Sequence, residues 1–247
     1  MKTSNHLLRR LTAALLAAVL ALSIALPVFA SDDGDTIYIN SVSDLLSLAK
    51  SCAYDQWSVG KTVILQKDLS LEGMLWEPIP SFSGQFKGNG HTISDLTITG
   101  QYSPAGLFGI VEEQGSIESL SVRGIVSVSD SADTTTGGIV GINHGTLINC
   151  QFTGVVTGDS EVGGIVGRNE SEGTIDHSTA RAIVTGKSST GGIAGYNLGA
   201  ITGCTNVGSI NTEYQEASLD TDGFTAKMVD QINNKMAAAD DDAHLHA

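Results

Sequence analysis

A four-residue glycine motif recurs along the middle of the chain and limits the possible folds more than any other feature. Residues 138–141 and 164–167 both have the sequence GIVG, and residues 192–195 have GIAG. A looser copy, GLFG, occupies residues 106–109, so successive copies start 32, 26 and 28 residues apart. A period of this size is typical of proteins in which one small structural unit is stacked several times.

Further matching segments follow each copy. An asparagine stands five residues after the first glycine of the three clear copies, at Asn143, Asn169 and Asn197. A glycine-led segment follows at residues 115–120, 145–150, 173–178 and 199–204, and a third apolar segment contains Val126, Val156, Val184 and Ile210. We therefore predict units of three short β-strands separated by turns of Gly, Asn or Ser.

None of these units could bury its apolar residues alone, so stacking must build the core. We predict an all-β fold, a right-handed parallel β-helix (β-solenoid), in which Gly138, Gly164 and Gly192 superpose. The hand follows from the preference of parallel strands for right-handed connections. A β-propeller is excluded because its blades need about 40 to 45 residues, more than the units of 26 and 28 residues found here.

The segments around the repeats predict the ends of the stack. Residues 62–65 and 90–99 are expected to form strands, joined by a rigid extended link at residues 76–80. Ser41 and Asp44 fit a capping pattern for a helix over residues 41–53, which would cover the first coil. A second helix is expected after the repeats, with one apolar face that could cap the other end; its residues are Phe224, Met228, Val229, Ile232 and Met236. Residues 240–246 are expected to form a disordered acidic tail.

The first thirty residues have the pattern of a secretory signal peptide. Lys2, Arg9 and Arg10 precede an apolar run from Leu11 to Leu26, and a small-x-small cleavage sequence ends at Ala30. The predicted organisation is a signal peptide at 1–30, an N-terminal strand and capping helix at 31–60, the solenoid at 61–211 and the C-terminal helix with its tail at 212–247. We expect no membrane span once the signal is cleaved.

The charge of the mature chain excludes one class of partner. Loss of the three basic residues of the signal changes the formal net charge from −14 to −17. Phosphate backbones are bound by Lys and Arg, so we expect no nucleic-acid partner. High acidity suits solubility outside the cell.

The repeats resemble the GLUG-motif family, named for the Gly-Leu-x-Gly-like core that residues 106–109 nearly reproduce. Residues 76–79 and 86–93 are similar to the segments that precede such arrays, and the resemblance extends over residues 36–211. It implies a β-solenoid from a secreted or surface-exposed bacterial protein. Such repeats occur in large surface proteins, in adhesins and in non-catalytic parts of secreted proteases, so the resemblance implies adhesion or scaffolding.

A carbohydrate-active enzyme is the alternative, because parallel β-helices also carry polysaccharide lyases and glycosidases. Alignment of the repeats puts Glu118, Ile148, Asp176 and Thr202 in one column, with no Lys or Arg among them. The two carboxylates would lie two coils apart, roughly 2 × 4.8 Å, at the outer limit for an inverting pair. Since Ile148 separates them, we interpret them as solvated surface groups and expect no enzyme.

Other polar and aromatic residues give no stronger site. Asp176 and His177 lack a nucleophile fixed beside them, His91 has the setting of a turn residue, and His244 and His246 belong to the acidic tail. The acidic stretches 130–133 and 159–161 do not match a calcium-binding motif. Trp57, Trp76 and Tyr102 could stack against sugars, although Trp76 is better placed in the core. The sequence thus predicts no catalytic, cofactor-binding or metal-binding residue.

Two polar columns are expected to be structural. Asn143, Asn169 and Asn197 should form a hydrogen-bonded ladder at one corner, where Asn tolerates left-handed backbone. Cys150 and Cys204 share one repeat position, with Ser178 between them, and should be small buried apolar fillers too far apart for a disulfide. We expect three free thiols, with Cys52 the most reactive. The partner is expected to be a glycan or a host or cell-surface protein.

Overall fold

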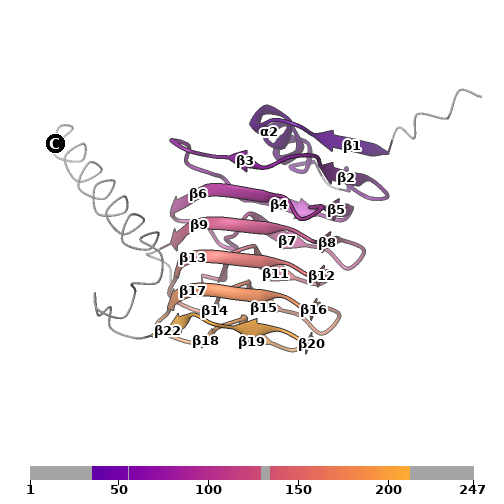
Figure 1. The fold of residues 1–247 in the computed structure, drawn as a ribbon. Helices are drawn as coiled ribbons and strands as arrows, with labels where there is room; N and C mark the ends of the chain where they lie inside the picture. Colours follow the sequence, from indigo (N-terminus) through magenta and orange to yellow (C-terminus); the bar gives the residue numbers. More distant parts are fainter. Residues whose placement is uncertain (1–34, 55, 129–133, 212–247) are drawn as a thin grey trace, which may run out of the picture. The chain divides into compact units, whose positions relative to one another are not determined.

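The fold was analysed in a computed structural model, which describes residues 35–54, 56–128 and 134–211. Within these ranges the chain forms an all-β parallel solenoid of about six turns (Figure 1). Every strand pair in the described residues is parallel, and the partners come from successive turns of the chain. The predicted β-solenoid is therefore confirmed, while its right-handed sense stays a prediction.

Four parallel sheets make up the sides of the coil. The first sheet contains β1 (Thr36–Ile39), β2 (Thr62–Leu65), β5 (Gln85–Lys87), β8 (Ser116–Glu118), β12 (Thr146–Ile148), β16 (Thr174–Asp176) and β20 (Ala200–Thr202). The second contains β3 (Leu69–Ser70), β6 (Thr92–Gly100), β9 (Ser121–Val128), β13 (Gln151–Thr157), β17 (Thr179–Thr185), β21 (Thr205–Asn206) and β22 (Ser209–Ile210). The third contains β4 (Ile79–Phe82), β7 (Phe108–Val111), β11 (Val140–Asn143), β15 (Val166–Asn169) and β19 (Ala194–Asn197). The fourth contains β10 (Thr136–Gly137), β14 (Val162–Gly163) and β18 (Thr190–Gly191).

The fourth sheet corrects the prediction of three strands per unit. Its strands have only two residues each, too short to show an alternation of apolar and polar side chains. The expected extended link at residues 76–80 is also corrected, because β4 begins within it at Ile79. Its backbone already belongs to the coil, since the Ile79 amide donates to the carbonyl of Leu107.

The glycine register is confirmed. Gly137 pairs with Gly163, and Val140 pairs with Val166, so Gly138 lies above Gly164. The next coil repeats this arrangement down to Gly192. A Cβ atom built on Gly164 would lie 2.2 Å from the carbonyl oxygen of Gly192, so the coils stack here without room for a side chain.

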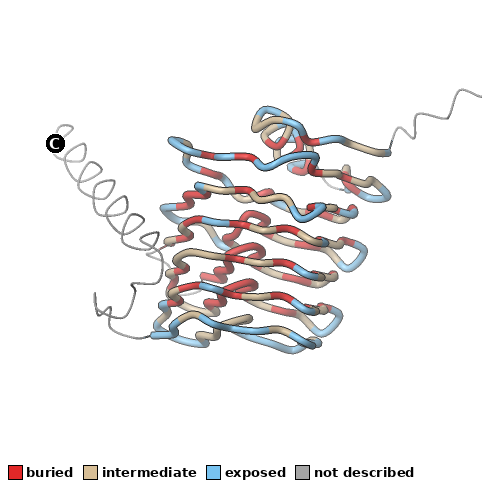
Figure 2. Tube along the Cα trace, in the orientation of Figure 1, coloured by how far each residue is buried: buried red, intermediate tan, exposed pale blue. Residues whose placement is uncertain are grey.

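The core follows the inward-facing residues of each strand from coil to coil (Figure 2). One such column of the first sheet contains Val63, Phe86, Ile117, Leu147 and Ile175, all fully buried. In the longer strands of the second sheet, every other residue faces outward. In β9, for example, buried residues alternate with partly or fully exposed ones. Side chains of alternating direction are the expected result of the strand repeat.

The predicted N-terminal cap is present as α2 (Val42–Ser51), the one helix of the described residues. The Ser41 hydroxyl accepts a hydrogen bond from the Asp44 amide at 3.2 Å, which satisfies an otherwise unpaired donor of the first turn. Leu45 and Leu48 are buried in the core, and the helix contacts β1 and β4. In the described part of the chain, no helix has the length and apolar content to span a membrane.

Three predicted segments lie outside the described residues: the signal peptide, the C-terminal helix and the acidic tail with His244 and His246.

Candidate functional site

The carboxylates proposed for an enzyme lie in one column on the outer face of the first sheet. Glu118, Ile148, Asp176 and Thr202 are consecutive partners, as the repeat alignment predicts. The prediction that no basic residue shares this column is wrong, because Lys87 pairs directly with Glu118. Ile148 still separates the two carboxylates, and the cation stands beside Glu118 rather than between them.

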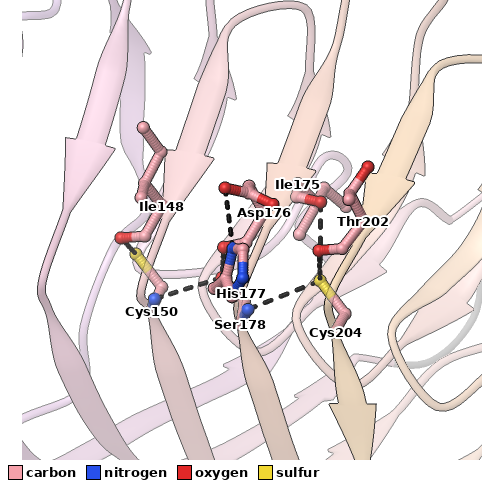
Figure 3. A network of polar contacts seen from close by, with 8 residues as sticks. All are labelled: Ile148, Cys150, Ile175, Asp176, His177, Ser178, Thr202 and Cys204. Carbon is pink, nitrogen blue, oxygen red and sulfur yellow. Dashed lines mark hydrogen bonds and ion pairs between the residues drawn. The ribbon is translucent and has the colours of Figure 1, made fainter.

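Asp176 interacts with the histidine that follows it (Figure 3). Its Oδ2 atom lies 2.9 Å from Nδ1 of His177. The backbone of His177 is left-handed, with φ of 46°, and the same corner of the two preceding coils has φ of 53° at Ser119 and Asn149. His177 therefore occupies a turn, as expected, and its imidazole extends from an exposed corner.

His91 is paired in a similar way with a different acid. Its Nδ1 atom lies 3.1 Å from Oδ1 of Asp68, and the Thr92 amide donates to the same oxygen at 2.9 Å. The Thr92 amide, followed by His91, lowers the pKa of Asp68. This contact ties the start of β6 to the preceding coil, which is a structural role.

The three ladder asparagines form the predicted stack. The Nδ2 atom of Asn143 donates to Oδ1 of Asn169 at 2.8 Å, and Asn169 repeats the bond to Asn197 at 2.8 Å. Asn143 and Asn169 are fully buried. The residues end β11, β15 and β19, and none has a left-handed backbone, so the reason given for Asn at this position is corrected. Instead, the asparagine side chains form hydrogen bonds with the backbone of their own turns. For example, the Gly145 backbone amide donates to Asn143 Oδ1 at 3.2 Å.

A second polar column runs through the position shared by Cys150, Ser178 and Cys204 (Figure 3). The Cys150 amide donates to Ser178 Oγ at 3.1 Å, and the Ser178 amide donates to Cys204 Sγ at 3.4 Å. Each side chain also donates to the carbonyl oxygen two residues earlier in its own coil. Cys150 and Ser178 are buried as expected, whereas Cys204 is half-buried, and the three side chains form hydrogen bonds at the corner that we did not expect.

The three cysteines are free thiols, all within the described residues. The expectation that Cys52 is the most reactive is wrong, because its side chain is only 3% exposed and burial raises its pKa to about 11. Cys150 is also buried, and its pKa is raised to about 12. Cys204 is half-buried, so it is the most accessible of the three.

The acidic stretch at residues 159–161 is bound by the protein itself. Glu161 accepts hydrogen bonds from Arg168 at 2.9 Å and from the Thr135 hydroxyl at 3.0 Å, and Asp159 pairs with Lys187. In the portion that the structure describes, no three His, Cys, Asp or Glu residues are placed to hold a metal ion. The other acidic stretch, at residues 130–133, lies outside that portion.

The aromatic residues suggested for sugar stacking are at least partly covered. Trp76 is buried, and its Nε1 atom donates to the Leu107 carbonyl at 3.1 Å, so its predicted place in the core is confirmed. Trp57 and Tyr102 pack partly against the core, and the Lys61 ammonium lies 5.3 Å from the centre of the Trp57 ring. These residues do not form one aromatic platform along a sheet.

Sequence reasoning missed one regular surface of the fold. We call it the second-sheet face: the outward side chains of β9, β13 and β17, which lie in register as four columns. The columns are Ser121, Gln151 and Thr179; Arg123, Thr153 and Arg181; Ile125, Val155 and Ile183; and Ser127, Thr157 and Thr185. Hydroxyl and aliphatic groups thus repeat at the spacing of the strands, about 4.8 Å. The signal was available in the sequence, as the alternation of the residues around Val126, Val156 and Val184.

Comparisons with known proteins agree with the repeat type. Residues 158–185 match the GLUG motif, and this stretch contains one coil of strands, β14 to β17. The resemblance inferred from the sequence is therefore confirmed for this repeat.

Two relatives share part of the sequence. Halomucin from Haloquadratum walsbyi is 36% identical over 155 residues, which cover 58% of this chain and 2% of that protein. A protein from Evansella cellulosilytica, named as a Gly-rich membrane protein, is 30% identical over 137 residues, or 40% of this chain and 16% of that protein. The chain thus spans a small fraction of either relative. The names and the shared repeat point to a surface repeat protein.

A crystal structure of a protein from Bacteroides ovatus, named as an immunoglobulin A1 protease, has a TM-score of 0.46 to this chain at 15% identity. The match covers 72% of this chain and 77% of that one.

Proposed function

We propose that this chain is a non-enzymatic, secreted or cell-surface module for adhesion or scaffolding, and that it binds its partner on the second-sheet face. The observation that carries the proposal is the in-register array of four outward columns on β9, β13 and β17. A repeated, flat arrangement of similar side chains suits a partner that is itself extended and repetitive. A glycan chain or a cell-surface protein would meet this requirement.

The chemistry of the face supports such a partner. The column of Ile125, Val155 and Ile183 offers apolar contact, while the column of Ser127, Thr157 and Thr185 beside it offers hydroxyl groups. Arg123 and Arg181 stand on either side of Thr153, in a chain whose formal net charge is −14. Arg181, which is exposed in this column, would favour a partner with a carboxylate or sulfate group at this place.

Secretion is part of the proposal and rests on the sequence of residues 1–30. Their basic start, apolar run and cleavage sequence are those of a signal peptide. The relatives named Halomucin and Gly-rich membrane protein are consistent with a place outside the cytoplasm.

A carbohydrate-active enzyme is the second candidate, favoured by the column that contains Lys87, Glu118 and Asp176. The two carboxylates stand two coils apart, roughly 2 × 4.8 Å, which is the outer limit for an inverting pair. Ile148 lies between them, and Asp176 is already paired with His177. We therefore favour the binding module.

Binding and turnover can be tested with one preparation. Residues 31–247, labelled with a fluorophore on surface lysines, would be applied to arrays of glycans and of extracellular-matrix proteins. The proposal expects retention on a defined set of ligands and release of no product when each retained glycan is incubated with the chain. Appearance of new reducing ends or unsaturated sugars, lost in the double variant Glu118→Gln and Asp176→Asn, would instead establish the enzyme.

A further inference from the structure

The last coil of the described residues exposes positions that belong to the core elsewhere. We call residues 192–211 the open coil. Ile201 is 38% exposed, although its partner Ile175 in the coil before is fully buried. Ile210 is 37% exposed, whereas its partner Val184 is fully buried. The open coil thus presents core-type residues with no described coil stacked on them.

Both polar columns also end at this coil. Asn197 accepts the ladder bond from Asn169 and turns its own Nδ2 atom back to the Gly199 carbonyl at 3.0 Å. Cys204 is half-buried, whereas Cys150 in the same column is buried. Apolar surface and unpaired strand edges at the end of a solenoid are a hazard for aggregation unless something covers them.

The opposite end of the stack shows how this fold covers its core. There Leu45 and Leu48 of α2 are buried in the hydrophobic core, and Cys52, just after the helix, is part of the same core. An amphipathic helix thus covers core side chains at that end of the stack.

The chain that follows the open coil contains a second segment with the same pattern. Thirty-six residues follow Asn211. Among them apolar side chains recur at helical spacing, while Asp230 and Asn234 fall on the opposite side of a helical wheel; the apolar residues are Phe224, Met228, Val229, Ile232 and Met236. A helix from 224 to 236 would be about 20 Å long. The twelve residues between Asn211 and Phe224 could reach roughly 40 Å when extended, enough to cross one coil.

We propose that residues 224–236 bind across the open coil as an amphipathic helix, with their apolar face on Ile201, Ile210 and the exposed side of Cys204. This cap is independent of the proposed function, because it concerns the end of the stack and not the second-sheet face. A second copy of the chain is the competing occupant of the open coil, and the experiment below separates the two.

The test measures how fast iodoacetamide alkylates Cys204 under native conditions, by mass spectrometry of the peptides. It uses residues 31–247, the chain expected after cleavage of the signal peptide. The substitution Ile232→Asp would place a charge on the apolar face, and Asn234→Asp would add the same charge to the polar face. We expect Ile232→Asp to speed alkylation of Cys204 about tenfold or more, as for a helix position that changes from buried to solvated, and Asn234→Asp to leave the rate unchanged.

Alkylation of the buried Cys150 reports whether the fold has survived. If Ile232→Asp also exposes Cys150, the milder Met228→Ser replaces it in the comparison. Equal alkylation of Cys204 in the unsubstituted chain and the apolar-face variants would overturn the cap. Protection of Cys204 that disappears on dilution of the unsubstituted chain would also overturn it, in favour of a second copy.

Discussion

The side-chain amide of Asn143 donates a 2.8 Å hydrogen bond to the side-chain carbonyl of Asn169, a residue 26 positions further along the chain. Each amide also binds backbone groups of its own turn, so one side chain joins a corner to the corner of the next coil. Buried amides are costly unless both their donors and acceptors are paired. The most regularly repeated polar residue of the motif is therefore explained by stacking and not by a ligand.

Replacement of the middle asparagine should destabilise the fold more than replacement of the last one. In Asn169→Ala, the buried Asn143 amide loses its ladder acceptor, and the bonds that Asn169 donates to Gly173, Asn197 and Ala200 disappear. We expect a loss of about 3 kcal/mol in the free energy of unfolding, since each buried unpaired group costs about 1 to 3 kcal/mol. Asn197→Ala, at an exposed position, should cost about 1 kcal/mol. Denaturant titrations of both variants give the comparison, and equal losses would contradict the ladder.

The sequence predicted strand partners correctly where residues could be counted at a constant spacing from coil to coil, and it failed where that spacing changes. The column from Glu118 to Thr202 was predicted because two residues separate each of its strands from the next strand, and the column from Asn143 to Asn197 because each Asn lies five residues after the first glycine of its motif. Lys87 was missed because four residues separate it from β6, whereas two separate Glu118 from β9. Because that corner is longer, counting residues does not place Lys87 opposite Glu118. The pairing of the two strands in the structure does.

Other errors came from residue chemistry that depends on its surroundings. Cys150 has the size of an apolar filler, but at this corner its thiol satisfies the Ile148 carbonyl at 3.4 Å. Cys52 was expected to be the most reactive thiol, yet it is buried and its helix packs against the core. Neither outcome can be derived from residue type and spacing alone, because each depends on tertiary packing.

A glycine of the second sheet should be intolerant of any side chain. Gly154 has φ of +151°, and a Cβ atom built there would meet the Gly124 carbonyl oxygen of the neighbouring coil at 1.8 Å. We expect Gly154→Ala to cost about 3 kcal/mol or more from overlap and backbone strain. Gly73→Ala serves as the control, because Gly73 also has a positive φ, +78°, but no atom lies within 4 Å of its added Cβ. It should cost about 1 kcal/mol, and thermal unfolding that ranks Gly73→Ala as the worse variant would refute the close approach of the coils.

Cys150 should make the fold sensitive to alkaline pH. Burial raises the pKa of its thiol from 9.0 to about 12, since the folded state disfavours the thiolate. The unfolded chain loses this proton near pH 9, so the contribution of Cys150 to stability is complete below pH 9 and is lost as the pH rises toward 12. The slope approaches about 1.4 kcal/mol per pH unit.

Comparison with Cys150→Ala isolates this effect from other titrating groups. The variant should be less stable than the unsubstituted chain at pH 7.5, and the gap should shrink by roughly 2 kcal/mol by pH 10.5. Denaturant midpoints measured at pH 7.5, 9 and 10.5 provide the values. A gap that stays constant over this range would mean that Cys150 is not held as a buried thiol.

The cysteine column predicts the redox state of the three thiols in an oxidising environment. Ser178 lies between Cys150 and Cys204, which places their Cα atoms roughly 2 × 4.8 Å apart, beyond the reach of a disulfide. Alkylation of denatured, unreduced protein followed by mass spectrometry should find all three thiols modified. A cross-linked peptide joining Cys150 to Cys204 would show that the coils are not stacked in this register.

The second-sheet face is tested most directly by the affinity of two matched variants for whichever ligand the arrays retain. Thr153→Asp places a carboxylate at the centre of the face, and Thr146→Asp places one at an outward position of the first sheet, with both threonines half-buried and in the same coil. Surface plasmon resonance should show a loss of affinity of about tenfold or more for Thr153→Asp, or about 1.4 kcal/mol, with Thr146→Asp unchanged. Equal affinity of Thr153→Asp and the unsubstituted chain, or a loss confined to Thr146→Asp, would contradict binding on this face.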